Sequence, residues 1–272
     1  MVRGRRGGYV AFDLETTGLV AGVDRVVEIG AVKFDPDGRE LGRFEQLVQP
    51  GRPMPPAAQA IHGISDADLA GAPTAREALP AFVDFLGDPE AVTLLAHNAW
   101  FDAGFLGREL GGTGRARPDY VVVDTLALAR RRLPNLPNHR LDTLARRLGL
   151  NPDGPHRALA DSLRVKDLWL ALDGPDQPPE ELVAYPLFDE TREVYAPVGW
   201  DPIADAITLG RRVRLEYTGG TRGTGPREVT PRAFIQRGGV AFLVAFCHID
   251  ALEKTFRLDR VRRFEVVVEA AP

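Results

Sequence analysis

Two acidic residues, Asp13 and Glu15, stand at the end of an apolar run near the start of the chain. The run from Gly8 to Leu14 is typical of a buried strand that ends in a turn. Residues two positions apart in a strand face the same side, so the two carboxylates are expected to project together. Paired carboxylate oxygens make half of a site for a hard divalent cation. An acidic pair that is simply solvated at a strand end is the alternative.

A second and a third polar segment follow farther along the chain. Asp102 comes shortly after the apolar run 91–96 and falls in the first turn of a predicted helix, where a carboxylate also complements the helix N-terminus. His156 follows Pro155, which ends the preceding element, and Asp161 lies about a turn and a half into the next predicted helix. Each segment alone is weak evidence for a site, because each has an ordinary structural explanation.

Taken in this order, the three segments resemble the DEDD exonuclease superfamily over about residues 8 to 172. Asp13 and Glu15 match its first motif, Asp102 its second, and His156 with Asp161 its third. One branch of the superfamily has a tyrosine four residues before the last aspartate, and the other has a histidine close to that place. Here the residue four before Asp161 is an arginine and His156 stands five before it, so the chain resembles the histidine branch, DEDDh.

This resemblance implies a fold, a reaction and cofactors. The fold is a ribonuclease H-like α/β domain, which is a mixed sheet flanked by helices. The reaction is 3′→5′ hydrolysis of single-stranded DNA or RNA, with DNA favoured, to 5′-mononucleotides. Asp13, Glu15, Asp102 and Asp161 would hold two divalent cations, Mg²⁺ or Mn²⁺, about 4 Å apart. His156 would serve as the general base, since histidine has an ordinary pKa of about 6.5 and exchanges protons near neutral pH.

The resemblance also implies residues that contact the substrate. Those just after the first motif would hold the 3′-terminal nucleotide through backbone amides and a wedge beneath its base. A loop over residues 61–64 would lie above that nucleotide, and residues around the second motif would line the cleft. The residues concerned are Thr16, Thr17, Leu19, His62, Asn98 and Phe101. The alternatives are that Leu19 and Phe101 belong to the core and that His62 lies on the surface.

The apolar periodicity supplies the elements that must position these residues. After an antiparallel start, strands alternate with amphipathic helices, which is typical of an α/β layer architecture. The predicted strands cover residues 8–14, 26–34, 42–48, 91–96 and 120–123, and the predicted helices cover residues 75–86, 101–110, 124–131, 141–148 and 156–170. We therefore expect an exonuclease domain over residues 1–172.

The composition changes after this domain. Prolines accumulate over residues 173–200 and predict a semi-rigid linker. Over residues 201–272 a short helix precedes alternating apolar and polar runs, which predict a small barrel-like sheet. These runs resemble the WYL domain, which implies an Sm/SH3-like barrel and a nucleic acid or nucleotide-like ligand, although Ala241-Phe242-Leu243 replaces the Trp-Tyr-Leu triplet. Arg257 and Arg260 fit the basic pattern of that family and suit phosphate oxygens, with plain solvation as the alternative.

Composition and charge limit the classes of protein and of metal site that the chain can form. The chain has 272 residues, 44% apolar and 26% charged, which fits two globular domains. Its single cysteine, Cys247, excludes an internal disulfide and a cysteine-built zinc site, so any metal must bind to oxygen or imidazole. The net charge of −4 hides a basic excess after residue 200. No apolar run reaches the roughly 18 residues of a membrane helix, and the start does not read as a leader segment, so we expect a cytoplasmic protein.

The expected partners are the 3′ ends of single-stranded DNA or RNA and, through replication or repair, a DNA polymerase or sliding clamp. The clamp is suggested by Tyr185-Pro-Leu-Phe188, which is similar to short clamp-binding peptides but lacks their leading glutamine. Packing of this segment is the alternative. A different class of function also stays open: a regulatory protein that senses a nucleotide or a single strand and carries an accessory exonuclease fold. Loss of function on removal of residues 200–272, but not on substitution of Asp13, would indicate it.

Overall fold

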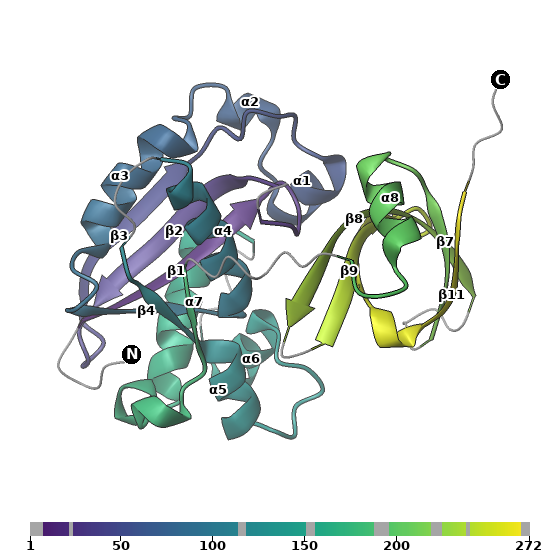
Figure 1. The fold of residues 1–272 in the computed structure, drawn as a ribbon. Helices are drawn as coiled ribbons and strands as arrows, with labels where there is room; N and C mark the ends of the chain where they lie inside the picture. The colour runs from purple at the N-terminus through teal and green to yellow at the C-terminus, as the bar shows by residue number, and fades with distance from the viewer. Residues whose placement is uncertain are drawn as a thin grey trace. The chain divides into compact units, whose positions relative to one another are not determined.

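The computed structural model describes residues 8–21, 24–113, 118–150, 156–187, 196–218, 225–237 and 240–267 of the chain (Figure 1). The chain divides into two compact units, one of Met1–Thr17 with Ala21–Asp189 and one of Gly18–Val20 with Glu190–Pro272. Within the described residues, no helix has both the length and the apolar character that crossing a lipid bilayer requires.

A six-stranded mixed sheet forms the centre of the first unit (Figure 1). In the order β3-β2-β1-β4-β5-β6, the first three strands form an antiparallel meander, β4 and β5 run parallel to β1, and β6 is antiparallel to β5. The strands are β1 (Gly8–Thr16), β2 (Val26–Phe34), β3 (Glu40–Leu47), β4 (Val92–Ala96), β5 (Val121–Asp124) and β6 (Ala184–Pro186). The α/β architecture that the sequence predicts is confirmed.

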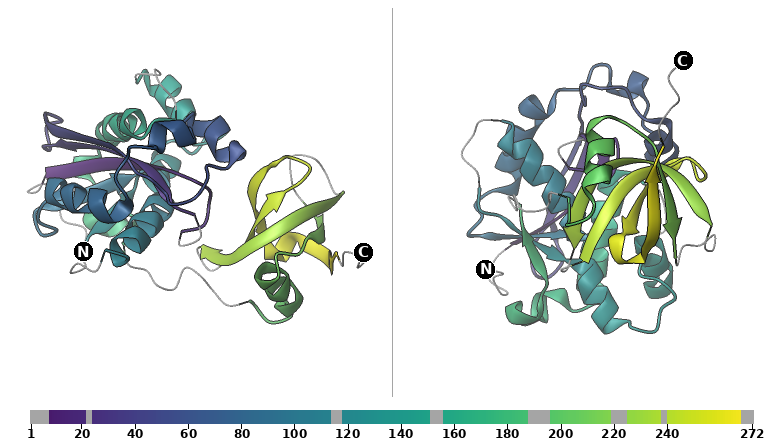
Figure 2. Two further views of the ribbon diagram at one scale, coloured as in Figure 1. Left: turned by 90° about the horizontal axis from the view of Figure 1, so that it is seen from above. Right: turned by 45° about the vertical axis from the view of Figure 1, so that its right-hand side comes forward.

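Helices cover both faces of this sheet (Figure 2). Side chains alternate along β1, so Val10 and Phe12 join one core with α3 and α4, whereas Tyr9 and Ala11 join a second core with α7. In the second core the ring of Tyr9 lies 5.5 Å from that of Trp169 in α7, measured between centroids. The helices are α1 (Pro56–His62), α2 (Asp66–Leu69), α3 (Ala75–Leu86), α4 (Ala99–Gly111), α5 (Thr125–Arg132), α6 (Leu141–Leu148) and α7 (Ala158–Ala171).

Gly30 in β2 lets the start of α7 lie directly against the sheet. A Cβ built on this glycine would stand 2.1 Å from backbone atoms of Ala158 and Leu159. Backbone atoms cannot turn aside as a flexible side chain can, so Gly30→Ala must push α7 away from the sheet. We expect this substitution to lower the free energy of unfolding by about 1–3 kcal/mol or more.

Chemical denaturation measures this effect, with Gly71→Ala as the matched control. A Cβ added at Gly71 meets no atom within 4 Å, so this variant should unfold within about 0.5 kcal/mol of the wild type. Equal stability of Gly30→Ala and wild type would show that the close approach of α7 to β2 is not required.

The proline-rich segment 173–200 differs in part from the expected linker. Its first half is folded as η1 (Gly174–Asp176), η2 (Pro179–Glu181) and β6, all within the first unit. Arg131 of α5 holds this segment, because its guanidinium donates to the carbonyl of Glu181 at 2.8 Å and to Oε1 of Gln177 at 2.7 Å. The sequence interpretation missed these contacts, since the partners are about 50 residues apart.

The segment that is similar to clamp-binding peptides lies at the end of this folded half. Tyr185 and Pro186 belong to β6, where they pair with β5, and Leu187 is buried. Phe188 lies outside the described residues. A peptide whose backbone is part of a sheet is not open to a partner, so the structure favours the packing alternative.

The second unit is an antiparallel sheet in the order β10-β9-β8-β7-β11, and α8 packs against its core. Val213, Leu215 and Tyr217 of β7 are buried, whereas Arg214 and Glu216 between them are exposed, as the alternating pattern predicts. The elements are α8 (Asp201–Thr208), β7 (Val213–Tyr217), β8 (Pro226–Arg237), β9 (Val240–Cys247), β10 (Leu252–Arg257), η3 (Leu258–Arg260) and β11 (Val261–Val266). The separate antiparallel all-β sheet expected after the linker is confirmed.

Candidate active site

Three of the carboxylates singled out by the sequence meet at the end of β1. One oxygen from each of Asp13, Glu15 and Asp161 lies within 4.8 Å of the other two. The alternation along β1 puts Asp13 and Glu15 on the face that α7 covers, and Asp161 lies in the first turn of α7. The close approach of α7 at Gly30 brings these elements together.

Asp102 reaches the same strand end from α4. It is buried in the first turn of that helix, and its Oδ1 accepts a hydrogen bond from the amide of Leu14 at 3.2 Å. Leu14 stands between Asp13 and Glu15, so Asp102 adjoins the three-carboxylate group without being one of its members. We call these four acids the carboxylate cluster.

Burial and mutual repulsion raise the pKa values in the carboxylate cluster. The pKa of Asp13 lies well above its ordinary value, first because of burial and then because of the charges of Asp102, Glu15 and Asp161. Burial also raises the pKa of Glu15 to about 8 and is the main cause of the raised pKa values of Asp102 and Asp161. Like charges this close require protons or cations to balance them. Carboxylate oxygens, with no sulfur among them, suit Mg²⁺ or Mn²⁺.

These raised pKa values predict a stability that depends on pH and on divalent cations. Carboxyl groups titrate near pH 4 in an unfolded chain, whereas burial raises the pKa of Glu15 to about 8 in the folded one. Between these values the folded chain binds more protons, so its free energy of unfolding should fall as the pH rises from about 4 to about 8. Mg²⁺ at about 100 times its Kd should add about 2.7 kcal/mol near the upper end of this range.

Thermal melts across this pH range, with and without Mg²⁺, measure both effects. Asp161→Asn removes one negative charge from the cluster, so it should weaken both the fall with pH and the response to Mg²⁺. A Mg²⁺ response that survives unchanged in this variant would place the cation elsewhere.

His156 lies two residues before α7 begins. Its backbone has a left-handed φ of 63°, its side chain is exposed, and its amide donates to Oδ2 of Asp161 at 3.1 Å. The helix was predicted to begin at His156, and it begins instead at Ala158. The physical reason is that a left-handed residue cannot belong to a right-handed helix. His156 is thus tied through its backbone to a member of the carboxylate cluster.

Asp124 is a residue of the site that the sequence interpretation missed. It ends β5 and is buried, and its Oδ1 accepts from the amides of Asn98 at 3.1 Å, Ala99 at 3.3 Å and Leu126 at 3.0 Å. It therefore holds the starts of α4 and α5 at once, with Asn98 in a left-handed conformation of φ 68°. The sequence could have indicated this role of Asp124, because an aspartate between an apolar strand and a helical pattern is a typical N-cap residue.

Several of the residues expected to contact the substrate lie in buried surroundings. Thr16 ends β1 and Thr17 follows it, and Oγ1 of Thr17 accepts from the amide of Arg25 at 3.0 Å. His62 ends α1, and its Nδ1 accepts from the amide of Ile64 at 3.1 Å. Burial lowers the pKa of His62. The alternative that His62 is a surface residue is therefore wrong.

The other three lie on loops and at the start of α4. Leu19 is in the bend after β1. Asn98 is the N-cap residue of α4. Phe101 follows in the first turn, half-buried against Phe105 with 4.7 Å between ring centroids, so the core alternative holds in part for it.

Arg257 and Arg260 belong to the second unit. Arg257 ends β10, and its guanidinium donates to both carboxylate oxygens of Asp259, at 3.0 and 2.6 Å. Arg260 ends η3 and is exposed, and its carbonyl accepts from the hydroxyl of Thr218. The carboxylate of Asp259 offsets part of the positive charge that these arginines would present to a phosphate.

Comparison with known proteins decides the family. A family profile described as Exonuclease matches residues 10–168, which is more than half of the chain. The chain belongs to this exonuclease family. A second profile, described as WYL domain, matches residues 200–266. The resemblances drawn from the motifs, to DEDDh exonucleases and to WYL domains, are thus confirmed.

The chain has relatives among DNA polymerase III proteins. It is 40% identical over 154 residues to the PolC-type DNA polymerase III of Bacillus cereus, across 57% of this chain and 10% of that protein. It is 39% identical over 166 residues to the DNA polymerase III subunit epsilon of Treponema pallidum, across 60% of this chain and 75% of that one. The chain spans about a tenth of the length of the PolC-type relatives that it matches.

A solved structure gives the same picture of the fold. The structure of exonuclease X in complex with 5′ overhanging duplex DNA is 29% identical in sequence to this chain. The two superpose with a TM-score of 0.50 over 64% of this chain and 96% of exonuclease X. The first unit therefore has the fold of a 3′→5′ exonuclease of the DEDDh type.

Proposed function

We propose that this protein removes mononucleotides one at a time from the 3′ end of single-stranded nucleic acid, preferably DNA. The observation that carries the proposal is the carboxylate cluster, in which Asp13, Glu15 and Asp161 lie within 4.8 Å and Asp102 adjoins them. Membership of the exonuclease family supports phosphodiester hydrolysis. The names of the relatives, which belong to DNA polymerase III, support DNA as the substrate and a polymerase as partner.

The carboxylate cluster would hold two divalent cations, Mg²⁺ or Mn²⁺. When bound, such cations supply positive charge at the scissile phosphate and make water easier to deprotonate. The donors fit because all are carboxylate oxygens from fixed elements, with Asp13 and Glu15 on β1 and Asp161 on α7.

His156 would take the proton of the attacking water. Its backbone bond to Asp161 keeps the residue beside the cluster, and its exposed ring is open to an incoming strand. We propose that the terminal nucleotide and the strand behind it contact Thr16, Thr17, Leu19, His62, Asn98 and Phe101.

The rest of the chain would assist this reaction. Arg257 and Arg260 of the WYL domain would add grip on nucleic acid by contacting phosphates. We propose an exonuclease domain over residues 1–172, a proline-rich segment over 173–200 whose first half packs with that domain, and a WYL domain over 201–272, in a protein of the cytoplasm.

A time course on 5′-labelled single-stranded DNA and RNA of one sequence tests the direction and the substrate. We expect a ladder that shortens from the 3′ end in Mg²⁺ or Mn²⁺, faster for DNA, and a slower ladder for the full chain carrying Arg257→Gln and Arg260→Gln. Early release of the labelled 5′ nucleotide would contradict the direction. No shortening of either strand, together with tight binding of one of them, would favour the regulatory protein that senses a single strand.

A further inference from the structure

Glu28 is a buried carboxylate beside the active site that is not one of the expected cation ligands. It lies in β2 opposite Glu15 in the register of β1 and β2, and none of its surface is exposed. Its charge adds to the repulsion that raises the pKa values of Asp13 and Glu15. Apolar residues of similar volume often stabilise a core as well as a buried ion pair does, so this ion pair is weak evidence for a role in stability alone.

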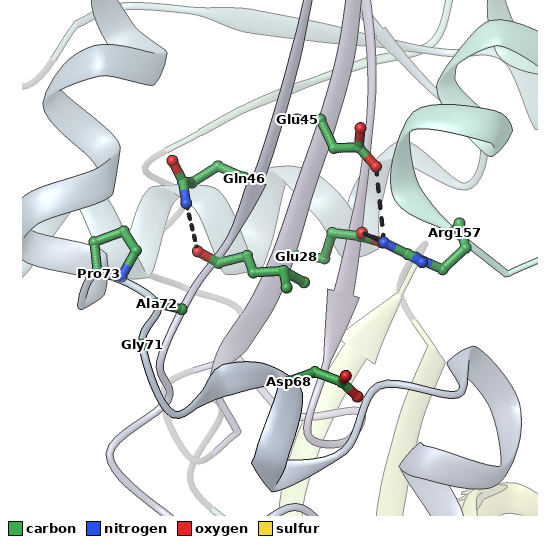
Figure 3. A pocket seen from close by; sticks show the side chains of 9 residues that line it. Glu28, Glu45, Gln46, Asp68, Gly71, Ala72, Pro73 and Arg157 are labelled. Carbon is green, nitrogen blue, oxygen red and sulfur yellow. Dashed lines mark hydrogen bonds and ion pairs between the residues drawn. The ribbon is translucent and has the colours of Figure 1, made fainter.

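The two oxygens of Glu28 bind the two residues that follow His156, and Figure 3 shows the pair that Glu28 makes with the first of them, Arg157. Arg157 donates through Nε to Oε1 at 3.0 Å and to Oε2 at 3.2 Å, and its Nη2 also donates to Oε1. The amide of Ala158, the first residue of α7, donates to Oε2 at 2.8 Å. One buried anion therefore holds both residues that follow His156, and it sits at a helix N-terminus, where negative charge is favoured.

The guanidinium of Arg157 pairs with two carboxylates and shares a cavity with a third. Its side chain is 48% exposed and borders a cavity of about 460 Å³ that Glu28, Glu45 and Asp68 also line (Figure 3). Oε1 of Glu45 lies 3.7 Å from Nη2 of Arg157 and makes a second ion pair. Three acids around one arginine leave the local charge negative, which disfavours a direct contact between Arg157 and a phosphate.

We propose that Glu28 and Arg157 are positioning residues that place the ring of His156 for proton transfer. The inference rests on the proposed role of His156 as general base. The segment is fixed at three successive residues: the amide of His156 by Asp161, and Arg157 and the amide of Ala158 by Glu28. The backbone of this segment sets the direction of the Cα–Cβ bond of His156, and with it the region that its ring can reach. A displacement of about 1 Å in a reacting group can cost about a hundredfold in rate.

A double-mutant cycle in the full chain tests this role. With Mn²⁺ present, Arg157→Gln should lower kcat about ten- to a hundredfold and leave KM nearly unchanged. In a His156→Asn background the same substitution should have almost no further effect, since the ring that it positions is gone. Arg157→Lys should restore part of kcat, because an ammonium group still pairs with Glu28 at one point.

Arg25→Gln is the matched control. Arg25 donates two bonds, at 2.7 and 2.8 Å, to the largely buried carboxylate of Glu109, and its side chain is 42% exposed. Breaking this pair should cost a similar amount of stability in thermal melts while kcat stays nearly unchanged. An equal fall of kcat in both variants would overturn the inference, because general loosening of the fold would then explain it.

NMR of the histidine rings separates this inference from the proposed function. The signals of His156, identified by their loss in His156→Asn, should shift in Arg157→Gln and stay in place in Arg25→Gln, whether or not the protein cuts DNA. If the wild type shows no nuclease activity but the His156 signals still shift in Arg157→Gln, the proposed function is overturned and the positioning is supported. Unmoved signals, full additivity in the cycle, or a change in KM alone would overturn the positioning, and the last would indicate that Arg157 binds the substrate.

Discussion

Asp13→Asn should lower kcat/KM at least about a thousandfold, which corresponds to about 4 kcal/mol of lost transition-state stabilisation. Asp13 is a half-buried member of the carboxylate cluster, and an amide in its place has one oxygen and no charge with which to hold a divalent cation. Without cations, the same substitution should raise the free energy of unfolding, because it removes one of several like charges. Steady-state kinetics and denaturation in a chelator measure the two effects.

Asp167→Asn is the matched control for this prediction. Asp167 lies in α7 as Asp161 does, and burial raises its pKa too, but it pairs with Lys166 and is not part of the carboxylate cluster. Its substitution should leave kcat/KM close to that of the wild type. If the Asp13→Asn variant is as active as the Asp167→Asn variant, Asp13 has no role in the reaction.

His156→Asn should lower kcat by about a hundred- to ten-thousandfold, the range that general bases contribute. Asparagine suits this position better than alanine, because His156 has a φ of 63° and asparagine tolerates the left-handed region. The backbone bond to Asp161 is then kept, and only the ring is lost. Kinetics at saturating Mn²⁺ give kcat, and calorimetric titration gives the affinity for the cation.

The two measurements together separate a base from a ligand. A general base predicts a lower kcat with an unchanged affinity for Mn²⁺. Weaker Mn²⁺ binding in His156→Asn would instead indicate that the imidazole is a ligand of the cation. An unchanged kcat would show that His156 has no catalytic role.

The parts of the site that local patterns describe could be predicted from the sequence. The period of two along β1 puts Asp13 and Glu15 on one side of the strand, and the structure has them together. The buried strands β2 and β4 were visible as apolar runs. The meeting of Asp13 with Asp161 was expected only from the family resemblance, since nothing local joins residues this far apart.

The rest depends on distant partners or on single backbone conformations. Glu28 lies within an apolar run, and its importance shows only when Arg157, 129 residues away, folds onto it. The short helices α1 and α2 lie in and after a proline-rich stretch, where Pro55 and Pro56 begin α1 and Ser65 caps α2. Prolines predict an irregular stretch when read alone, although a proline in the first turn also starts a helix.

Digestion of 5′-labelled single-stranded DNA by the wild type and Asp161→Asn, in Mg²⁺ and then in excess chelator, tests the central claim most directly. In our proposal the carboxylate cluster would hold the divalent cations that the protein needs to hydrolyse a strand from its 3′ end. We predict a ladder that shortens from the 3′ end for the wild type in Mg²⁺, no ladder in chelator, and almost none for Asp161→Asn. Equal ladders for both proteins, or shortening that continues in chelator, would contradict the account.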